Sequence, residues 1–143
     1  MLKYYKYQYR FNATHSFDYQ KEHEHQHTFT VTLYVSKERQ NDPIMFYDFD
    51  KAVHQYLDQF EHCILNEHPL FIHTVPNIEN MGNVFFDDLK RLLKKLNICL
   101  YQLDISENPL STYQISSRIH LPAAYEQIAL NQHPNSQGAI LKE

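Results

Sequence analysis

The sequence predicts one α+β domain with the element order strand, strand, helix, helix, strand, strand. Four segments alternate apolar and polar residues with a period of two, which is typical of strands. Two segments between them carry apolar residues at helical spacing. The chain has 143 residues, enough for one domain, and no internal repeat or low-complexity tract divides it.

The first two strands are expected to form a hairpin. Residues 4–15 alternate between a polar face and an aromatic face that ends in Ala13 and His15. Residues 25–35 repeat the pattern, with His25 and His27 at the start of the apolar face. The polar segment 18–24 suits a loop joining two antiparallel strands.

Two helices are predicted to follow. From Phe49 to Phe60 the apolar residues recur at three- and four-residue intervals, and Asp48 is expected to be the N-cap. The second helix is predicted over residues 78–96, where Asn77 can cap the start.

The C-terminal part is predicted to add two strands and a tail. The strands cover residues 98–106 and 111–121, and the turn-forming Glu107-Asn108-Pro109 separates them. From Pro122 onward the residues are mostly polar, and we expect a mobile tail. The predicted domain is therefore 1–121, with a tail over 122–143.

Composition narrows the class of protein. The net charge is -4, so no basic surface indicates nucleic-acid binding. No stretch approaches the ~18 apolar residues of a membrane span, and the N-terminus lacks an apolar signal core. Cys63 and Cys99 have no CxxC or secretory context. We therefore expect a soluble cytoplasmic protein that binds neither nucleic acid nor membranes.

Three histidines predict a metal site. His25 and His27 are two residues apart on a strand, so their side chains leave the same face. A hairpin would bring His15 opposite this pair. Three neutral imidazoles with one open position are typical of catalytic zinc. An HxH pair alone also occurs in solvated loops. His23 would fall on the same face as His25 by alternation, but it lies in the polar loop.

Six short segments occur in an order that resembles one enzyme family. In this sequence they stand as Ala13-Thr14-His15, His25-Gln26-His27-Thr28-Phe29, Asp48-Phe49, Phe60-Glu61-His62-Cys63-Ile64-Leu65-Asn66, Pro76-Asn77-Ile78-Glu79-Asn80 and Glu107-Asn108. Together they resemble the 6-pyruvoyl- and 6-carboxy-tetrahydropterin synthases, whose pattern reads AAH, HGHNY, DF, LDHxxLN, PTxEN and ET.

The resemblance implies a fold and a site. The fold is the tunnelling fold, a four-stranded antiparallel sheet with two helices packed on one face, which assembles into a barrel-like homo-oligomer, a trimer or hexamer. The cofactor is Zn²⁺, held by His15, His25 and His27. The substrate is a small pterin molecule.

The resemblance also implies which residues contact the substrate. Glu107 would accept two N–H bonds from the pterin's 2-amino group and N3. Asn77 and Glu79 of the PTxEN segment would bind the substrate too. The alternative for Glu107 is a turn residue before Pro109.

The resemblance implies that His62, paired with an acidic neighbour, moves protons, a role that suits imidazole side chains in general. The neighbour is usually an aspartate, whereas here it is Glu61. The alternative is that His62 is an exposed polar residue at the end of a helix.

The usual nucleophile is missing, which changes the expected reaction. Enzymes of the biopterin and queuosine pathways place a cysteine shortly before the HxH pair, and this sequence has none there. A folate-related branch instead reads ExxHGH, which Glu22 matches. In that branch the glutamate is the base in a retro-aldol cleavage of dihydroneopterin to 6-hydroxymethyl-dihydropterin.

The sequence therefore predicts a zinc-dependent pterin side-chain lyase acting on 7,8-dihydroneopterin or its triphosphate, with Glu22, His62 and Glu61 as catalytic residues. Three alternatives stay open. The reaction can be of the 6-carboxy or 6-pyruvoyl type carried by His62, the chain can be a catalytically silent pterin- or metal-binding homologue, and Glu22 can be one charge in a solvated loop.

Overall fold

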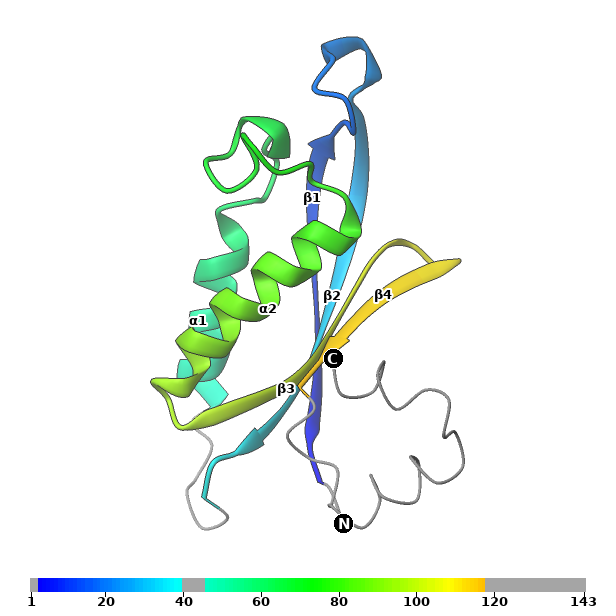
Figure 1. Ribbon diagram of the computed structural model, residues 1–143. Helices are drawn as coiled ribbons and strands as arrows, with labels where there is room; N and C mark the ends of the chain where they lie inside the picture. Colours follow the sequence, from blue (N-terminus) through cyan, green and yellow to red (C-terminus); the bar gives the residue numbers. More distant parts are fainter. Residues whose placement is uncertain (1–2, 40–45, 118–143) are drawn as a thin grey trace, which may run out of the picture.

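The computed structural model describes residues 3–39 and 46–117. One antiparallel sheet has the strand order β1-β2-β3-β4, and two helices cover one of its faces (Figure 1). The elements are β1 (Tyr5–His15), β2 (His25–Lys37), α1 (Phe46–Asp58), α2 (Ile78–Lys94), β3 (Ile98–Asn108) and β4 (Ser111–Ser116). The predicted α+β fold with this element order is confirmed.

The core lies between the sheet and the helices, where the apolar faces of the strands meet the helical stripes. Phe11 and Phe29 stack across the β1–β2 pair with 5.1 Å between ring centroids. Phe60 and Phe85 contact Phe11 from the helical side. The alternation predicts Tyr5 on the same face, but at the end of β1 it is exposed. The period-two pattern therefore marks buried residues only where the helices cover the sheet.

The helix boundaries differ in part from the prediction. α2 starts as expected, because the Asn77 side chain accepts a hydrogen bond from the Asn80 amide at 2.8 Å. Asp48 is not the N-cap of α1, since the helix begins at Phe46 and Asp48 lies in its first turn. A carboxylate there is also favourable to the helix dipole, so cap and first turn give similar sequence signals. No helix in the described ranges is long and apolar enough to cross a membrane.

The turn between β3 and β4 lies later than predicted. β3 continues through Asn108, so Glu107 is a strand residue. The Asn108 side chain accepts a hydrogen bond from the Leu110 amide at 2.9 Å, which centres the turn on residues 109–110. Residues 118–121 of the predicted last strand and the predicted tail 122–143 lie outside the described residues, so the domain limit at 121 stays a prediction.

A loop segment covers the upper edge of β1. The His62 amide donates to the Asn12 carbonyl at 2.6 Å, and the Thr14 amide donates to the Cys63 carbonyl at 2.9 Å. Thr14 and Ile64 form a parallel bridge. Backbone groups that would otherwise be open at a sheet edge are thereby paired.

The two hairpins separate at one end of the sheet. β1 and β2 stay paired up to His15 and His25, whereas the last pair between β2 and β3 is Thr30 and Ser106. Beyond it the β3–β4 hairpin turns away from β1 and β2 (Figure 1). We call this divergence of the two hairpins beyond Thr30 and Ser106 the fork.

Helix α2 holds the β3–β4 hairpin through a close approach at Gly82. A Cβ added to Gly82 would lie 2.8 Å from Tyr113 Cδ2. A side chain at position 82 would therefore have to displace the Tyr113 ring, which glycine avoids.

Candidate metal centre

His15 ends β1 and is completely buried, with 0% of its side chain exposed. Its Nδ1 lies 2.7 Å from the Pro76 carbonyl oxygen, which can only accept, so Nδ1 carries the proton. The lone pair of His15 is therefore on Nε2. Burial is the main cause that lowers the His15 pKa, which keeps the ring neutral. A neutral imidazole with an oriented free nitrogen is the form that binds a metal.

His25 and His27 open β2 opposite the end of β1. His25 pairs with His15 and His27 pairs with Ala13. The His15 ring centroid is 4.5 Å from that of His25 and 5.4 Å from that of His27. His25 Nδ1 lies 3.1 Å from the His23 carbonyl, which leaves Nε2 of His25 for a ligand. The structure thus brings together the three predicted metal ligands.

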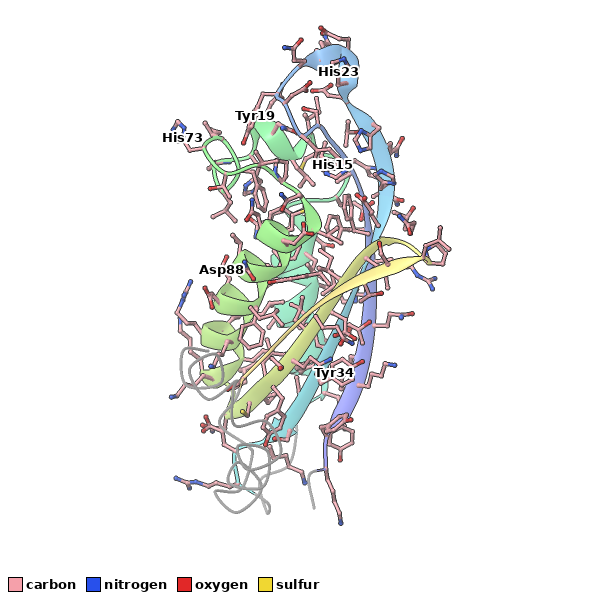
Figure 2. The ribbon with its side chains drawn as sticks, turned by 45° about the vertical axis from the view of Figure 1, so that its right-hand side comes forward. His15, Tyr19, His23, Tyr34, His73 and Asp88 are labelled. Atoms are coloured by element: carbon pink, nitrogen blue, oxygen red, sulfur yellow. The ribbon has the colours of Figure 1, made fainter. Side chains whose placement is uncertain are left out.

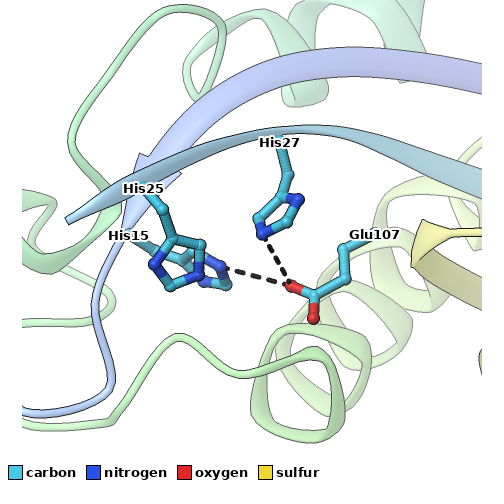
Figure 3. A group of neighbouring side chains, drawn as sticks. All are labelled: His15, His25, His27 and Glu107. Atoms are coloured by element: carbon cyan, nitrogen blue, oxygen red, sulfur yellow. Dashed lines mark ion pairs between the residues drawn. The ribbon is translucent and has the colours of Figure 1, made fainter. Parts of the chain in front are cut away.

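Glu107 of β3 joins the three histidines from across the fork (Figure 3). Its Oε2 is 3.2 Å from His15 Nε2 and 3.8 Å from His27 Nε2. The potential ligand atoms of all four residues lie within 4.8 Å of one another. We call His15, His25, His27 and Glu107 the His/Glu cluster.

Two atoms of the His/Glu cluster show that a cation fits it. His15 Nε2 and Glu107 Oε2 are buried and have no hydrogen-bond partner. Both are acceptors when His15 is neutral and Glu107 is ionised, and they face each other at 3.2 Å. Buried polar atoms are rarely left unpaired, because this costs roughly 1–3 kcal/mol each. Imidazole nitrogens with one carboxylate oxygen form a donor set that suits zinc.

The sequence reasoning missed the place of Glu107 in this cluster. Glu107 was predicted to be a pterin contact where the third strand ends, with a turn residue as the alternative, and β3 indeed continues through Asn108. The alternation of residues along the strand could have indicated this position. Glu107 shares its parity with Leu103 and Ile105, which are buried on the helix-covered face.

Asn66 fixes the chain directly after His15, and the sequence reasoning gave it no role. Its side chain accepts from the Ser16 amide at 2.8 Å and donates to the Ser16 carbonyl at 2.9 Å. Asn66 and Ser16 are both buried. The paired bonds act like a further rung of the sheet and hold the end of β1.

An exposed aromatic ring lies beside the cluster. The Phe17 ring centroid is 5.1 Å from that of His15 and 5.6 Å from that of His25, although Phe17 is exposed. Phe29 contacts His15 from the core at 5.2 Å. The cluster thus has a buried aromatic floor and an aromatic neighbour at the surface.

Glu22 lies outside the cluster, in a short 3-10 turn (Lys21–His23) at the tip of the β1–β2 hairpin. Its side chain is exposed. His23 contacts the Asp18 carboxylate and is not part of the cluster, as expected for a loop residue (Figure 2). Near the start of the hairpin loop, Tyr19 has a left-handed backbone with φ 60°, and its hydroxyl donates to the Phe71 carbonyl at 2.6 Å.

Glu61 and His62 lie at the covered edge of β1. His62 Nε2 is 3.4 Å from Glu61 Oε1, and 73% of the His62 side chain is exposed. Glu61 Oε1 also accepts from the backbone and the side-chain amide of Asn12, both at 3.2 Å. Within residues 3–39 and 46–117, neither Glu61 nor His62 belongs to the group of potential metal ligands.

The PTxEN-like segment contacts the cluster through a backbone carbonyl group. Pro76 accepts from His15, and Asn77 uses its side-chain oxygen as the cap of α2. Glu79 is exposed in the first turn of that helix. The contacts of Asn77 and Glu79 in the described structure are therefore structural, and their binding of a substrate stays a prediction.

Neither cysteine lies in the hairpin loop, where the family pattern places its nucleophile. Cys63 lies in the loop beside β1 and Cys99 lies in β3, both partly buried and unpaired. Burial is the main cause that raises the pKa of both thiols. Both therefore stay protonated at neutral pH.

Known proteins resemble the chain in both sequence pattern and structure. The family model described as 6-pyruvoyl tetrahydropterin synthase matches residues 4–118. A search of curated proteins finds no significant match.

Solved structures of 6-pyruvoyl tetrahydropterin synthases have the same fold. The enzyme of Caenorhabditis elegans is 19% identical with a TM-score of 0.68, over 80% of this chain and 95% of that one. The enzyme of Plasmodium falciparum is 14% identical with a TM-score of 0.55, over 81% and 99%. A catalytic-residue mutant of the Plasmodium vivax enzyme is 13% identical with a TM-score of 0.55, over 82% and 99%.

These matches confirm the resemblance read from the six sequence segments and the tunnelling fold that it implied. The family match spans β1 to β4 and includes all four residues of the His/Glu cluster. The chain belongs to the 6-pyruvoyl tetrahydropterin synthase family.

Proposed function

We propose that the chain is a zinc-dependent lyase that cleaves the side chain of a reduced pterin. The substrate is 7,8-dihydroneopterin or its triphosphate, and the reaction is a retro-aldol cleavage to 6-hydroxymethyl-dihydropterin. The observation that carries the proposal is the His/Glu cluster with its two unpaired buried acceptors, in a chain of this family. His15, His25 and His27 would hold the metal. Bound zinc supplies a Lewis acid, which lowers the pKa of a hydroxyl group beside it.

Glu22 is proposed as the general base. It stands three residues before His25 and, with no cysteine in the hairpin loop, is the carboxylate that matches the family spacing. Mutants of the Plasmodium vivax enzyme, in which a glutamate is replaced, are described as catalytic-residue mutants. The exposure of Glu22 is compatible with this role, because catalytic hydrogen bonds often form only in the substrate complex.

The pterin ring is proposed to bind in the fork. Glu107 is the carboxylate there that can accept parallel N–H bonds from the pterin edge. Asn77 and Glu79 at the start of α2 are proposed as further contacts. Phe17 offers an exposed ring beside the histidines.

A second candidate function places the proton chemistry on His62. Its 3.4 Å contact with Glu61 is the observation that favours it, because a carboxylate beside an imidazole can orient the ring for proton transfer. The reaction would then be of the 6-carboxy or 6-pyruvoyl type. A silent pterin- or metal-binding homologue is the third outcome.

We also infer that the protein is a homo-oligomer, a trimer or hexamer, that works in the cytoplasm. On its outer side β4 pairs with no further strand within the described residues, and an open edge favours association between copies. The two unpaired cysteines suit a reducing compartment.

The reaction is tested by incubating zinc-loaded protein with 7,8-dihydroneopterin and with its triphosphate, and identifying the products by mass. Wild type should release 6-hydroxymethyl-dihydropterin. Glu22→Gln should lower the rate by about 10²–10⁴ while its zinc content stays the same, because a general base is lost.

Glu24→Gln is the matched control, since it removes the same charge two residues further along the loop and should keep activity. Full activity in Glu22→Gln would reject the retro-aldol base and favour His62. No product with wild type would favour the silent homologue.

A further inference from the structure

We propose that Glu107 is the fourth protein ligand of the metal in the substrate-free protein, so that the centre is His15, His25, His27 and Glu107. The observation is the approach of its Oε2 to His15 Nε2 and His27 Nε2, at 3.2 and 3.8 Å. No pterin is needed for this inference, and it holds whichever reaction the protein catalyses.

The hydrogen bond of His15 turns its free nitrogen towards Glu107. His15 donates from Nδ1 to the Pro76 carbonyl, so Nε2 of the neutral ring is an acceptor. Glu107 Oε2 is an acceptor too when the carboxyl group is ionised, and both atoms are buried without a hydrogen-bond partner. A metal ion between two such acceptors satisfies both atoms.

The distances also match direct ligation. Two ligand atoms on one tetrahedral zinc, each about 2.0–2.1 Å from it, lie about 3.3 Å apart. The two measured distances of 3.2 and 3.8 Å lie close to this value. A carboxylate that only orients a metal-bound histidine would sit on the nitrogen opposite the metal. In His15 that nitrogen is occupied by Pro76.

Glu107 lies where the strand pairing of β3 becomes irregular. The last β2–β3 pair is Thr30 and Ser106, and the β3–β4 register shifts between Ile105 and Asn108. The exposed fraction of the side chain is 0% for His15, 20% for Glu107 and 29% for His27. If the proposed pterin reaction is correct, we expect Glu107 to leave the metal for the substrate, because the proposed function also assigns it to the pterin edge.

The test measures zinc affinity by competition with a chromophoric chelator. Glu107→Gln should bind zinc at least about tenfold more weakly, since loss of even an outer-shell partner typically costs 10–100-fold. Glu67→Gln is the matched control, because Glu67 is an exposed carboxylate in the 3-10 turn Leu65–Glu67, outside the cluster. It should bind zinc like wild type.

The visible spectrum of the Co²⁺-substituted protein separates ligation from a charge effect. Direct ligation requires the d–d bands of Glu107→Gln to differ from those of wild type and Glu67→Gln. Weaker zinc binding with an unchanged spectrum would overturn the proposal in favour of a charge effect, and unchanged affinity would overturn it outright.

Thermal unfolding of the metal-free proteins serves as the control that each variant is correctly folded. Metal-free Glu107→Gln should unfold no earlier than wild type, because it loses a buried unpaired carboxylate oxygen. The increase in Tm on adding zinc should shrink. Glu107→Ala serves the same test if the Gln variant does not fold. None of these measurements uses a pterin, so an inactive protein leaves the proposal testable.

Discussion

Two histidine–carboxylate pairs in this chain have nearly the same separation and opposite surroundings. His15 and Glu107 are 3.2 Å apart in the fork, and His62 and Glu61 are 3.4 Å apart at the edge of β1. His15 is fully buried, whereas 73% of the His62 side chain is exposed.

The difference between the pairs lies in what else their atoms contact. Glu61 accepts from two Asn12 groups, and water can reach His62. The facing atoms of His15 and Glu107 have no hydrogen-bond partner. Distance alone therefore does not identify a metal site. The combination of burial with two unpaired acceptors indicates one, because a metal ion between them would satisfy both atoms.

The largest expected contrast is metal content. His15→Ala should abolish the binding of about one zinc per chain, because a tetrahedral site loses its most buried ligand. His62→Ala should keep the zinc content of wild type. Metal analysis of both purified variants checks this. An unchanged zinc content in His15→Ala would contradict the assignment of the cluster.

The next contrast concerns the bonds that hold His15 in place. Asn66→Ala should lower the free energy of unfolding by roughly 2 kcal/mol or more, since it leaves the Ser16 amide and carbonyl unpaired in a buried place. Asn83→Ala is the control, because Asn83 is exposed on α2 and makes one exposed bond with Tyr113. Urea unfolding of the metal-free proteins gives both values. An equal decrease in the free energy of unfolding for both variants would show that the buried Asn66 bonds stabilise the protein no more than the exposed Asn83 bond.

The smallest contrast is a thiol reaction beside His62. Burial raises the pKa of the Cys63 thiol, so its reactive thiolate should form at higher pH than in a free cysteine, whose pKa is about 8.5. At pH 7.5 a disulfide reagent should modify Cys63 more slowly than free cysteine, and the rate should rise as the pH increases. Measuring this on Cys99→Ser isolates Cys63. Fast modification at pH 7.5 would instead indicate an activated thiol, and a mechanism with Cys63 as the nucleophile would have to be considered.

The sequence predicted the strands, the helices and the three clustered histidines, because period-two and helical patterns report directly which side chains share a face. Cap and turn positions were less predictable. Asp48 lies inside α1 and Glu107 inside β3, since acidic residues suit a cap, a first turn or a loop equally well.

The contacts that complete the candidate site come from residues far apart in the sequence. Glu107 reaches His15 across the fork, and Asn66 reaches Ser16 from a loop. The residue pattern of one strand or one helix does not contain this information. The exposed positions of Glu22 and His62 likewise depend on how the loops fold back.

The bond between His15 and the Pro76 carbonyl joins two parts of the molecule that are 61 residues apart. Pro76 directly precedes Asn77, the cap of α2, so the ring that is proposed to bind the metal also anchors the start of a helix. Opening of the first turn of α2 and release of the His15 ring thus become one local event rather than two. We therefore expect metal binding at His15 to slow the opening of the first turn of α2 as well.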